Sequence, residues 1–130
     1  MCDIPDYYEV HTRKARKVHT CMECFEPIQI GETYEDYAHV DMGKMWHHKT
    51  CDNCSNLRIL LSPMYQEHVY ECGIMGGELQ EAFVELVVMN QIKLPPEILK
   101  LVPQKWVERA NKSMEHRIKY YHETHELIAV

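Results

Sequence analysis

The sequence has no long apolar run. None of its 130 residues belongs to a stretch of about 18 consecutive apolar residues, so we expect no membrane-spanning helix. The N-terminal segment is acidic and has no apolar core of the kind that a secretory signal peptide carries. We therefore expect a cytoplasmic protein, which would be in the bacterial host's cytoplasm if the chain is encoded by a phage.

The chain also lacks the common catalytic and nucleotide-binding signatures. It contains no P-loop, no dinucleotide-binding glycine motif, no HExxH and no GxSxG. The sequence has fewer basic than acidic residues, with 14 Lys and Arg and 20 Asp and Glu, so its formal net charge is −6. This balance is not that of a general nucleic-acid binder. With no catalytic motif in the sequence, we expect a protein that is not an enzyme.

Two CxxC pairs are the strongest positive signal. Cys21 and Cys24 form the first pair, Cys51 and Cys54 form the second, and 26 residues separate the pairs. Four thiolates complete a tetrahedral shell around Zn²⁺ with no position open for water or substrate, which is typical of a structural site. In the cytosol such pairs are more often metal ligands than disulfides. The sequence therefore predicts one structural zinc ion.

The segment between the pairs predicts a β-hairpin. Residues 32–40 are rich in β-branched and aromatic side chains, residues 41–44 include Gly43 for a turn, and residues 45–48 would form the returning strand. A helix is expected from about Cys51 to Leu61, where Ser62-Pro63 would stop or restart it. A knuckle, a hairpin and a second CxxC at a helix start make a treble-clef-like module. A bound zinc would contribute roughly 10–16 kcal/mol, comparable to or larger than the stability of a whole domain.

The second half predicts helices. Apolar residues recur at helical spacing over 79–89, Pro95-Pro96 closes that element, and a longer helix is expected over about 104–125. The fold class is thus α+β, with an extended N-terminal lead at 1–12, a zinc-binding module at 13–61 and a helical extension at 62–130. The apolar residues of the last helix lie along one stripe of its surface. This stripe predicts core packing, with a dimer interface or a partner-binding face as the alternative. The interface candidates are Trp106, Met114, Tyr120 and Tyr121.

Two histidines leave the fourth ligand open. Either His47 or His48 could replace a cysteine in a Cys₃His site, although successive strand residues point to opposite faces and only one could reach the metal. With Ile28, Gly31-Glu32 and Trp46, the series Cys21-x2-Cys24…His48-x2-Cys51-x2-Cys54 resembles the first half of a LIM domain. That resemblance implies His48 in place of Cys54 as the fourth ligand.

A second resemblance covers residues 13–58 and 72–86, which are similar to a group of small proteins of tailed bacteriophages and their prophages. The shared pattern is Arg13-Lys14-Ala15-Arg16-Lys17-x-His19-x-Cys21-x2-Cys24, Ile28, Gly31-Glu32-x-Tyr34, Asp41-x-Gly43, Lys49-Thr50-Cys51-x2-Cys54 and Cys72-Gly73…Gly77-Glu78-Leu79. The resemblance implies a single zinc on the four cysteines and a phage origin. We therefore expect an accessory protein that binds a host or phage macromolecule, a protein in the first instance.

Two alternatives remain. The basic run, which contributes +4 over residues 11–20, could contact nucleic acid or an acidic partner, or could simply offset the negative zinc-thiolate site. Its members are Arg13, Lys14, Arg16 and Lys17. The second alternative is a degenerate HNH-like nuclease, because residues 51–56 resemble the end of such a motif. That chemistry needs a general-base histidine beside a divalent metal, and the usual Asp-His doublet before the hairpin is missing.

Overall fold

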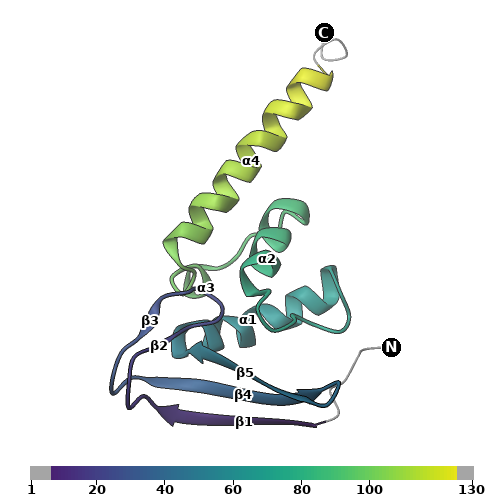
Figure 1. Cartoon of the computed structure of the whole chain (residues 1–130). Helices are drawn as coiled ribbons and strands as arrows, with labels where there is room; N and C mark the ends of the chain where they lie inside the picture. Colours follow the sequence, from purple (N-terminus) through teal and green to yellow (C-terminus); the bar gives the residue numbers. More distant parts are fainter. Residues whose placement is uncertain (1–6, 126–130) are drawn as a thin grey trace.

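The computed structural model describes the backbone of residues 7–125 and the side chains of residues 9–116. A three-stranded antiparallel sheet lies at one end of the molecule, and helix α4 extends away from it at the other (Figure 1). Helix α1 contacts two strands of the sheet and also packs against α2, which in turn contacts α4. The predicted α+β class is confirmed.

The sheet has the strand order β1-β4-β5, formed by Tyr7–Lys14, Thr33–Asp41 and Lys44–Cys51. Strands β4 and β5 form the predicted hairpin, which closes at Asp41↔Lys44 through a two-residue turn. Both turn residues have positive φ, 53° at Met42 and 76° at Gly43, which matches the right-handed twist of the two strands. The predicted hairpin is therefore confirmed, with β5 longer than expected.

Strand β1 begins in the segment predicted as an extended lead and ends at Lys14, inside the predicted zinc-binding module. Its pairing with β4 is antiparallel and runs from Tyr7↔Val40 to Lys14↔Thr33. Pairing with β1 leaves β4 in the centre of the sheet with a neighbour on both sides. A second, two-stranded sheet joins β2 (His19–Thr20) to β3 (Pro27–Ile28) and frames the first CxxC pair.

Helix α1 spans Asp52–His68 and continues through Pro63, so the expectation that Ser62-Pro63 would stop or restart the helix is wrong. The proline removes one backbone donor, which frees the carbonyl of Ile59. Both Pro63 and Ile59 are exposed, so water can hydrate that carbonyl. The boundary drawn at Leu61 between module and extension falls inside this helix, and Leu61 is fully buried.

The second half is helical as predicted. Helix α2 (Leu79–Val84) runs directly into a π-helix, η1 (Glu85–Met89), and a short α3 (Pro96–Leu99) precedes the long α4 (Gln104–His125). One continuous apolar core connects these helices with α1 and with the cysteine-bearing knuckle. Its largest fully buried members are Trp106, Phe83, Ile28, Leu57, Leu61, Leu79 and Leu86.

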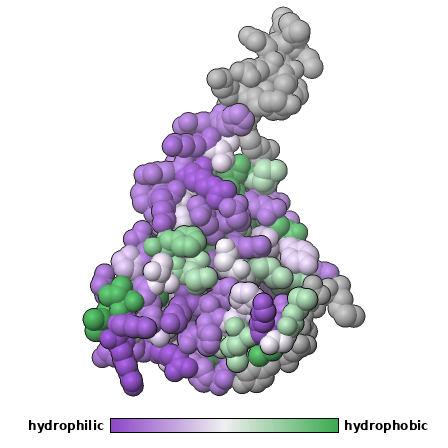
Figure 2. Space-filling model, in the orientation of Figure 1, coloured by the Kyte–Doolittle hydropathy of each residue, from purple (hydrophilic) through white to green (hydrophobic). Residues whose placement is uncertain are grey.

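Trp106 belongs to this core and is not available to a partner, which corrects its inclusion among the interface candidates. Its side chain is fully buried, with its ring 6.5 Å from that of Phe83. Met114, two turns further along α4, is 39 % exposed. The side chains of Tyr120 and Tyr121 lie outside the described residues. On the face of the molecule that Figure 2 shows, most residues are hydrophilic and the hydrophobic ones form small separate groups.

The different burial of two residues on α4 gives a test of the core. We expect Trp106→Ala to lower the free energy of unfolding by about 3–5 kcal/mol, because it removes a fully buried aromatic side chain and leaves a cavity. Met114→Ala is the matched control and should change it by much less. Denaturant unfolding followed by circular dichroism measures both. Equal, small effects would show that Trp106 does not anchor the core.

Candidate metal centre

The four cysteines converge from two separate elements. Cys21 and Cys24 lie in the loop between β2 and β3, Cys51 ends β5 and is the N-cap of α1, and Cys54 lies in the first turn of that helix. Their four sulfur atoms all lie within 4.8 Å of one another. Cys21, Cys24 and Cys54 are buried and Cys51 is half-buried.

Backbone hydrogen bonds fix the first pair as a knuckle. Phe25 N–H donates to the carbonyl of Cys21 at 3.0 Å, and Phe25 itself adopts the left-handed conformation with φ 60°. Met22 N–H donates to the carbonyl of Lys49 at 2.8 Å, which holds the knuckle against the end of β5. The two CxxC pairs are thereby brought together by main-chain contacts and not by the sulfur atoms alone.

Further N–H groups point at the sulfur atoms. The Sγ of Cys21 accepts hydrogen bonds from the N–H of Glu23 at 3.4 Å and of Cys51 at 3.3 Å. The Sγ of Cys51 accepts one from the N–H of Cys54 at 3.5 Å. Such donors stabilise thiolates, the form in which cysteine binds metal.

The pKa values of the four thiols follow from their mutual contacts. Hydrogen bonds from the Cys51 and Cys54 thiols hold the pKa of Cys21 far below its ordinary value. The hydrogen bond that Cys51 gives to Cys21 raises the pKa of Cys51 to about 12, and hydrogen bonds to Cys21 and Cys51 raise the pKa of Cys54. Burial raises the pKa of Cys24. Because cysteine binds metal as the thiolate, a bound cation must displace protons from the thiols whose pKa is raised.

The geometry fits a zinc ion. A tetrahedral site with Zn–S bonds of about 2.3 Å has sulfur–sulfur separations of roughly 3.8 Å. The Sγ atoms of Cys24 and Cys51 are 3.9 Å apart. The four cysteines are therefore positioned to bind a single metal ion. When bound, zinc would link the knuckle covalently to the start of α1 and supply no open position for a substrate.

His47 and His48, the two alternative ligands, lie away from the cysteine cluster. His47 points to one face of the hairpin, where its Nδ1 is 3.4 Å from a carboxylate oxygen of Asp36. His48 points to the opposite face and stacks on His39, with ring centroids 5.4 Å apart. In the part of the chain whose side chains are described, the four cysteines alone form a group of three or more candidate ligands.

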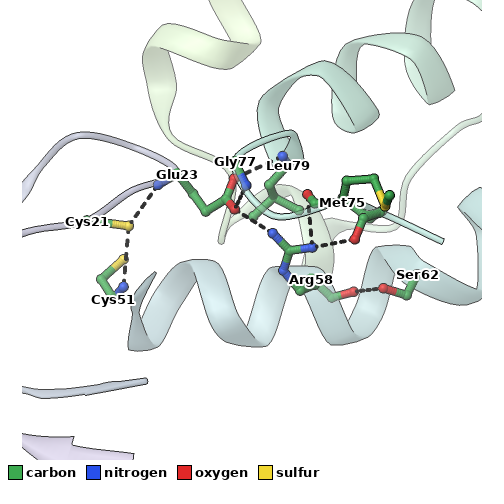
Figure 3. Close-up of polar contacts among 9 residues, drawn as sticks. Cys21, Glu23, Cys51, Arg58, Ser62, Met75, Gly77 and Leu79 are labelled. Atoms are coloured by element: carbon green, nitrogen blue, oxygen red, sulfur yellow. Dashed lines mark hydrogen bonds and ion pairs between the residues drawn. The ribbon is translucent and has the colours of Figure 1, made fainter. Parts of the chain in front are cut away.

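Glu23, between Cys21 and Cys24, is a buried residue beside the cluster that sequence reasoning missed. Its side chain is only 2 % exposed and accepts hydrogen bonds from Arg58 Nη2 at 2.5 Å, Gly77 N–H at 2.7 Å and Leu79 N–H at 2.9 Å (Figure 3). The Arg58 guanidinium also donates to the carbonyl of Ile74 at 2.8 Å. The knuckle is thereby tied to α1 and to the start of α2.

A second set of contacts ties the knuckle to α4. Lys105 donates a hydrogen bond to the carbonyl of Cys24 and lies 3.5 Å from a carboxylate oxygen of Glu26. Asn53, in the first turn of α1, donates to the carbonyl of Leu101 at 2.5 Å. The residues around the cysteines therefore contact the start of α2, the turn that follows α3, and α4. No sequence motif marks these contacts, because each joins residues far apart in the chain.

The residues of the basic run lie in different surroundings. Arg13 lies on β1 and pairs with Asp36 at 3.1 Å, whereas Lys14, Arg16 and Lys17 are exposed. Ala15, in the middle of the run, is buried and exchanges backbone hydrogen bonds with Gly31 and Glu32. One of the four basic side chains is thus partly neutralised within the fold.

Comparison of the chain with protein-family models, with curated proteins and with solved structures finds no match. No helix in the described residues has both the length and the apolar character needed to cross a membrane.

The ligand set can be tested by metal analysis. We expect purified protein to contain one zinc ion per chain, and we expect Cys54→Ser to lose it because three thiols cannot close the shell. His48→Ala and His47→Ala should each retain zinc, since neither imidazole lies at the cluster. Elemental analysis after chelator-free gel filtration measures the content. Loss of zinc in His48→Ala with retention in Cys54→Ser would instead establish a Cys₃His site.

The Glu23 contacts predict a change in stability that is separable from zinc binding. We expect Glu23→Gln to keep zinc but to lower the free energy of unfolding by about 3 kcal/mol, because it removes the charge that offsets the partly buried Arg58. Glu26→Gln, in the same loop but 65 % exposed, is the control and should cost well under 1 kcal/mol. Denaturant unfolding of the zinc-loaded proteins measures both. If Glu23→Gln releases zinc at unchanged stability, the carboxylate acts on the metal centre and not on packing.

Proposed function

We propose that this chain is a non-enzymatic adaptor in which a structural zinc ion stabilises a surface that binds another protein. The observation that carries the proposal is the convergence of four cysteine sulfur atoms within 4.8 Å. Four thiolates fill a tetrahedral shell, so a zinc ion held there would have no position left for a water nucleophile or a substrate. Such a site serves the scaffold and leaves function to the surface that the scaffold holds.

The module has a surface suited to a protein partner. The β2–β3 arm and the knuckle expose several large apolar side chains: Val18, Met22, Phe25 and Ile30. Phe25 and Ile30 are 67 % and 68 % exposed. Apolar and aromatic side chains held by a rigid turn are typical anchors of protein interfaces. A treble-clef arrangement of the module is consistent with this role.

The sequence pattern of residues 13–58 and 72–86, which resembles that of small phage proteins, motivates a more particular proposal. We infer an accessory protein of a tailed bacteriophage or prophage that acts in the cytoplasm of the bacterial host. Its partner would be a host or phage protein. The helix α4, which extends away from the sheet, offers a second face for that partner or for a second copy of the chain (Figure 1).

Nucleic-acid binding is the second candidate, and the exposure of Lys14, Arg16 and Lys17 favours it. Binding to phosphates weakens steeply with salt, whereas an apolar protein interface does not. The degenerate nuclease remains a third prediction. It requires Mg²⁺-dependent cleavage of DNA by the purified protein, which we do not expect.

A capture experiment separates these candidates. Immobilised zinc-loaded protein is exposed to bacterial lysate with and without nuclease, across a salt series. We expect the wild-type chain to retain a protein that resists both treatments and that Phe25→Ser no longer retains, because the change removes an exposed aromatic anchor. The matched variant Lys14→Ala with Lys17→Ala should retain it. Retention that disappears with nuclease, with salt and in the lysine variant would establish nucleic-acid binding instead.

A further inference from the structure

A cavity of about 700 Å³ lies between one face of the β4–β5 hairpin and the loop that precedes α2. It is separate from the cysteine cluster, although the Glu23–Arg58 pair forms part of its wall. Ile74 and Met75 supply apolar surface from the loop, and Val10 does so from β1. Its size and its mixture of apolar and polar walls are those of a small-molecule site.

Three rings gather on the sheet side of this cavity. Tyr37 and His48 face each other across the two strands, and His39 lies two residues further along β4, so strand alternation places all three on one face. The centroids of Tyr37 and His39 are 5.3 Å apart, and those of His39 and His48 are 5.4 Å apart with the planes only 12° from parallel. All three residues line the cavity.

The two imidazoles each have a nitrogen without a partner. The Nδ1 atoms of His39 and His48 are buried, and neither forms a hydrogen bond within the described residues. Leaving a buried polar atom unpaired costs about 1–3 kcal/mol, so native structures rarely contain two side by side. Burial and the neighbouring His39 both lower the pKa of His48, which favours the neutral form of its ring.

The charges of the wall favour a cation. Three carboxylates line the cavity, those of Glu23, Glu35 and Asp41, against the single guanidinium of Arg58. Arg58 and Glu23 pair with each other, and Arg58 also donates to backbone carbonyls. Within the described part of the chain, Glu35 and Asp41 form no ion pair. Two carboxylates therefore remain in excess, and an anionic ligand would be repelled.

We propose that this cavity binds a small organic cation, an ammonium or guanidinium group, against the rings of Tyr37, His39 and His48. The face of Tyr37 attracts such a cation, and Glu35 and Asp41 balance its charge. A metal cation fits less well, because the cavity brings no three ligand atoms together in the described residues. The cation is either a free amine or a basic side chain of a protein, and the two share this chemistry.

Titration of the zinc-loaded full chain with agmatine, which carries both groups, tests the proposal. Histidine ring signals in NMR report the site, and calorimetry gives the affinity. We expect agmatine to shift the signals of His39 and His48 and to leave those of His47, on the opposite face, unchanged. Sodium phosphate and an uncharged alcohol of similar length should shift none of them. A short arginine-containing peptide that binds more tightly than agmatine identifies a protein side chain as the source, and the reverse order identifies a free amine.

Variants then locate the binding groups. Glu35→Gln combined with Asp41→Asn should weaken agmatine binding by about tenfold or more, the scale of one ion pair or cation–π contact. His47→Ala and Glu67→Gln, both outside the cavity, should bind as the wild type does. Circular dichroism and zinc content confirm that each variant is folded. The proposal is overturned if agmatine leaves the His39 and His48 signals unmoved, if phosphate binds in its place, or if the carboxylate variant binds agmatine with undiminished affinity.

Discussion

The convergence of four thiols on one point is the constraint on which the rest of the structure depends. It joins a loop between two very short strands to the junction of β5 and α1, and both are too small to be stable alone. A metal ion that binds the folded form contributes its whole binding free energy to folding. The knuckle can therefore be rigid even though much of its own surface, including Phe25, faces solvent.

Glu23 extends that constraint into the second half of the chain. Because it lies between two cysteines, its carboxylate is held wherever the knuckle is held, and Arg58, Gly77 and Leu79 are bound to it in turn. A buried carboxylate is costly unless it is fully paired, which makes the arrangement specific as well as strong. The helical half thus packs on the cysteine module through polar contacts as well as through the apolar core.

The hairpin separates two kinds of chemistry by strand alternation alone. On one face Asp36 contacts Arg13 and His47, while on the other Tyr37, His39 and His48 line the cavity. A shift of one residue in the pairing of β4 and β5 would exchange the two sets. The tight turn at Met42-Gly43 fixes this register, so a short turn at one end determines which histidine faces the cavity.

The sequence by itself determined the features that depend on local spacing. These are the four cysteines of the two CxxC pairs, the hairpin with its turn at Gly43, and the helical periods of 79–89 and 104–125. It also predicted a break at Pro63, which the structure does not contain. Helix propensity counts the hydrogen bond that proline removes, but it does not take into account that water can reach the freed carbonyl of Ile59.

Only the tertiary structure decided the contacts between distant segments. Glu23 and Arg58 are 35 residues apart, and Glu23 and Leu79 are 56 apart, so no short pattern marks them. The burial of Trp106 and the cavity beside His39 both depend on which faces pack together. Periodicity shows that a face is apolar or polar, but the partner of that face is set by packing of the whole chain.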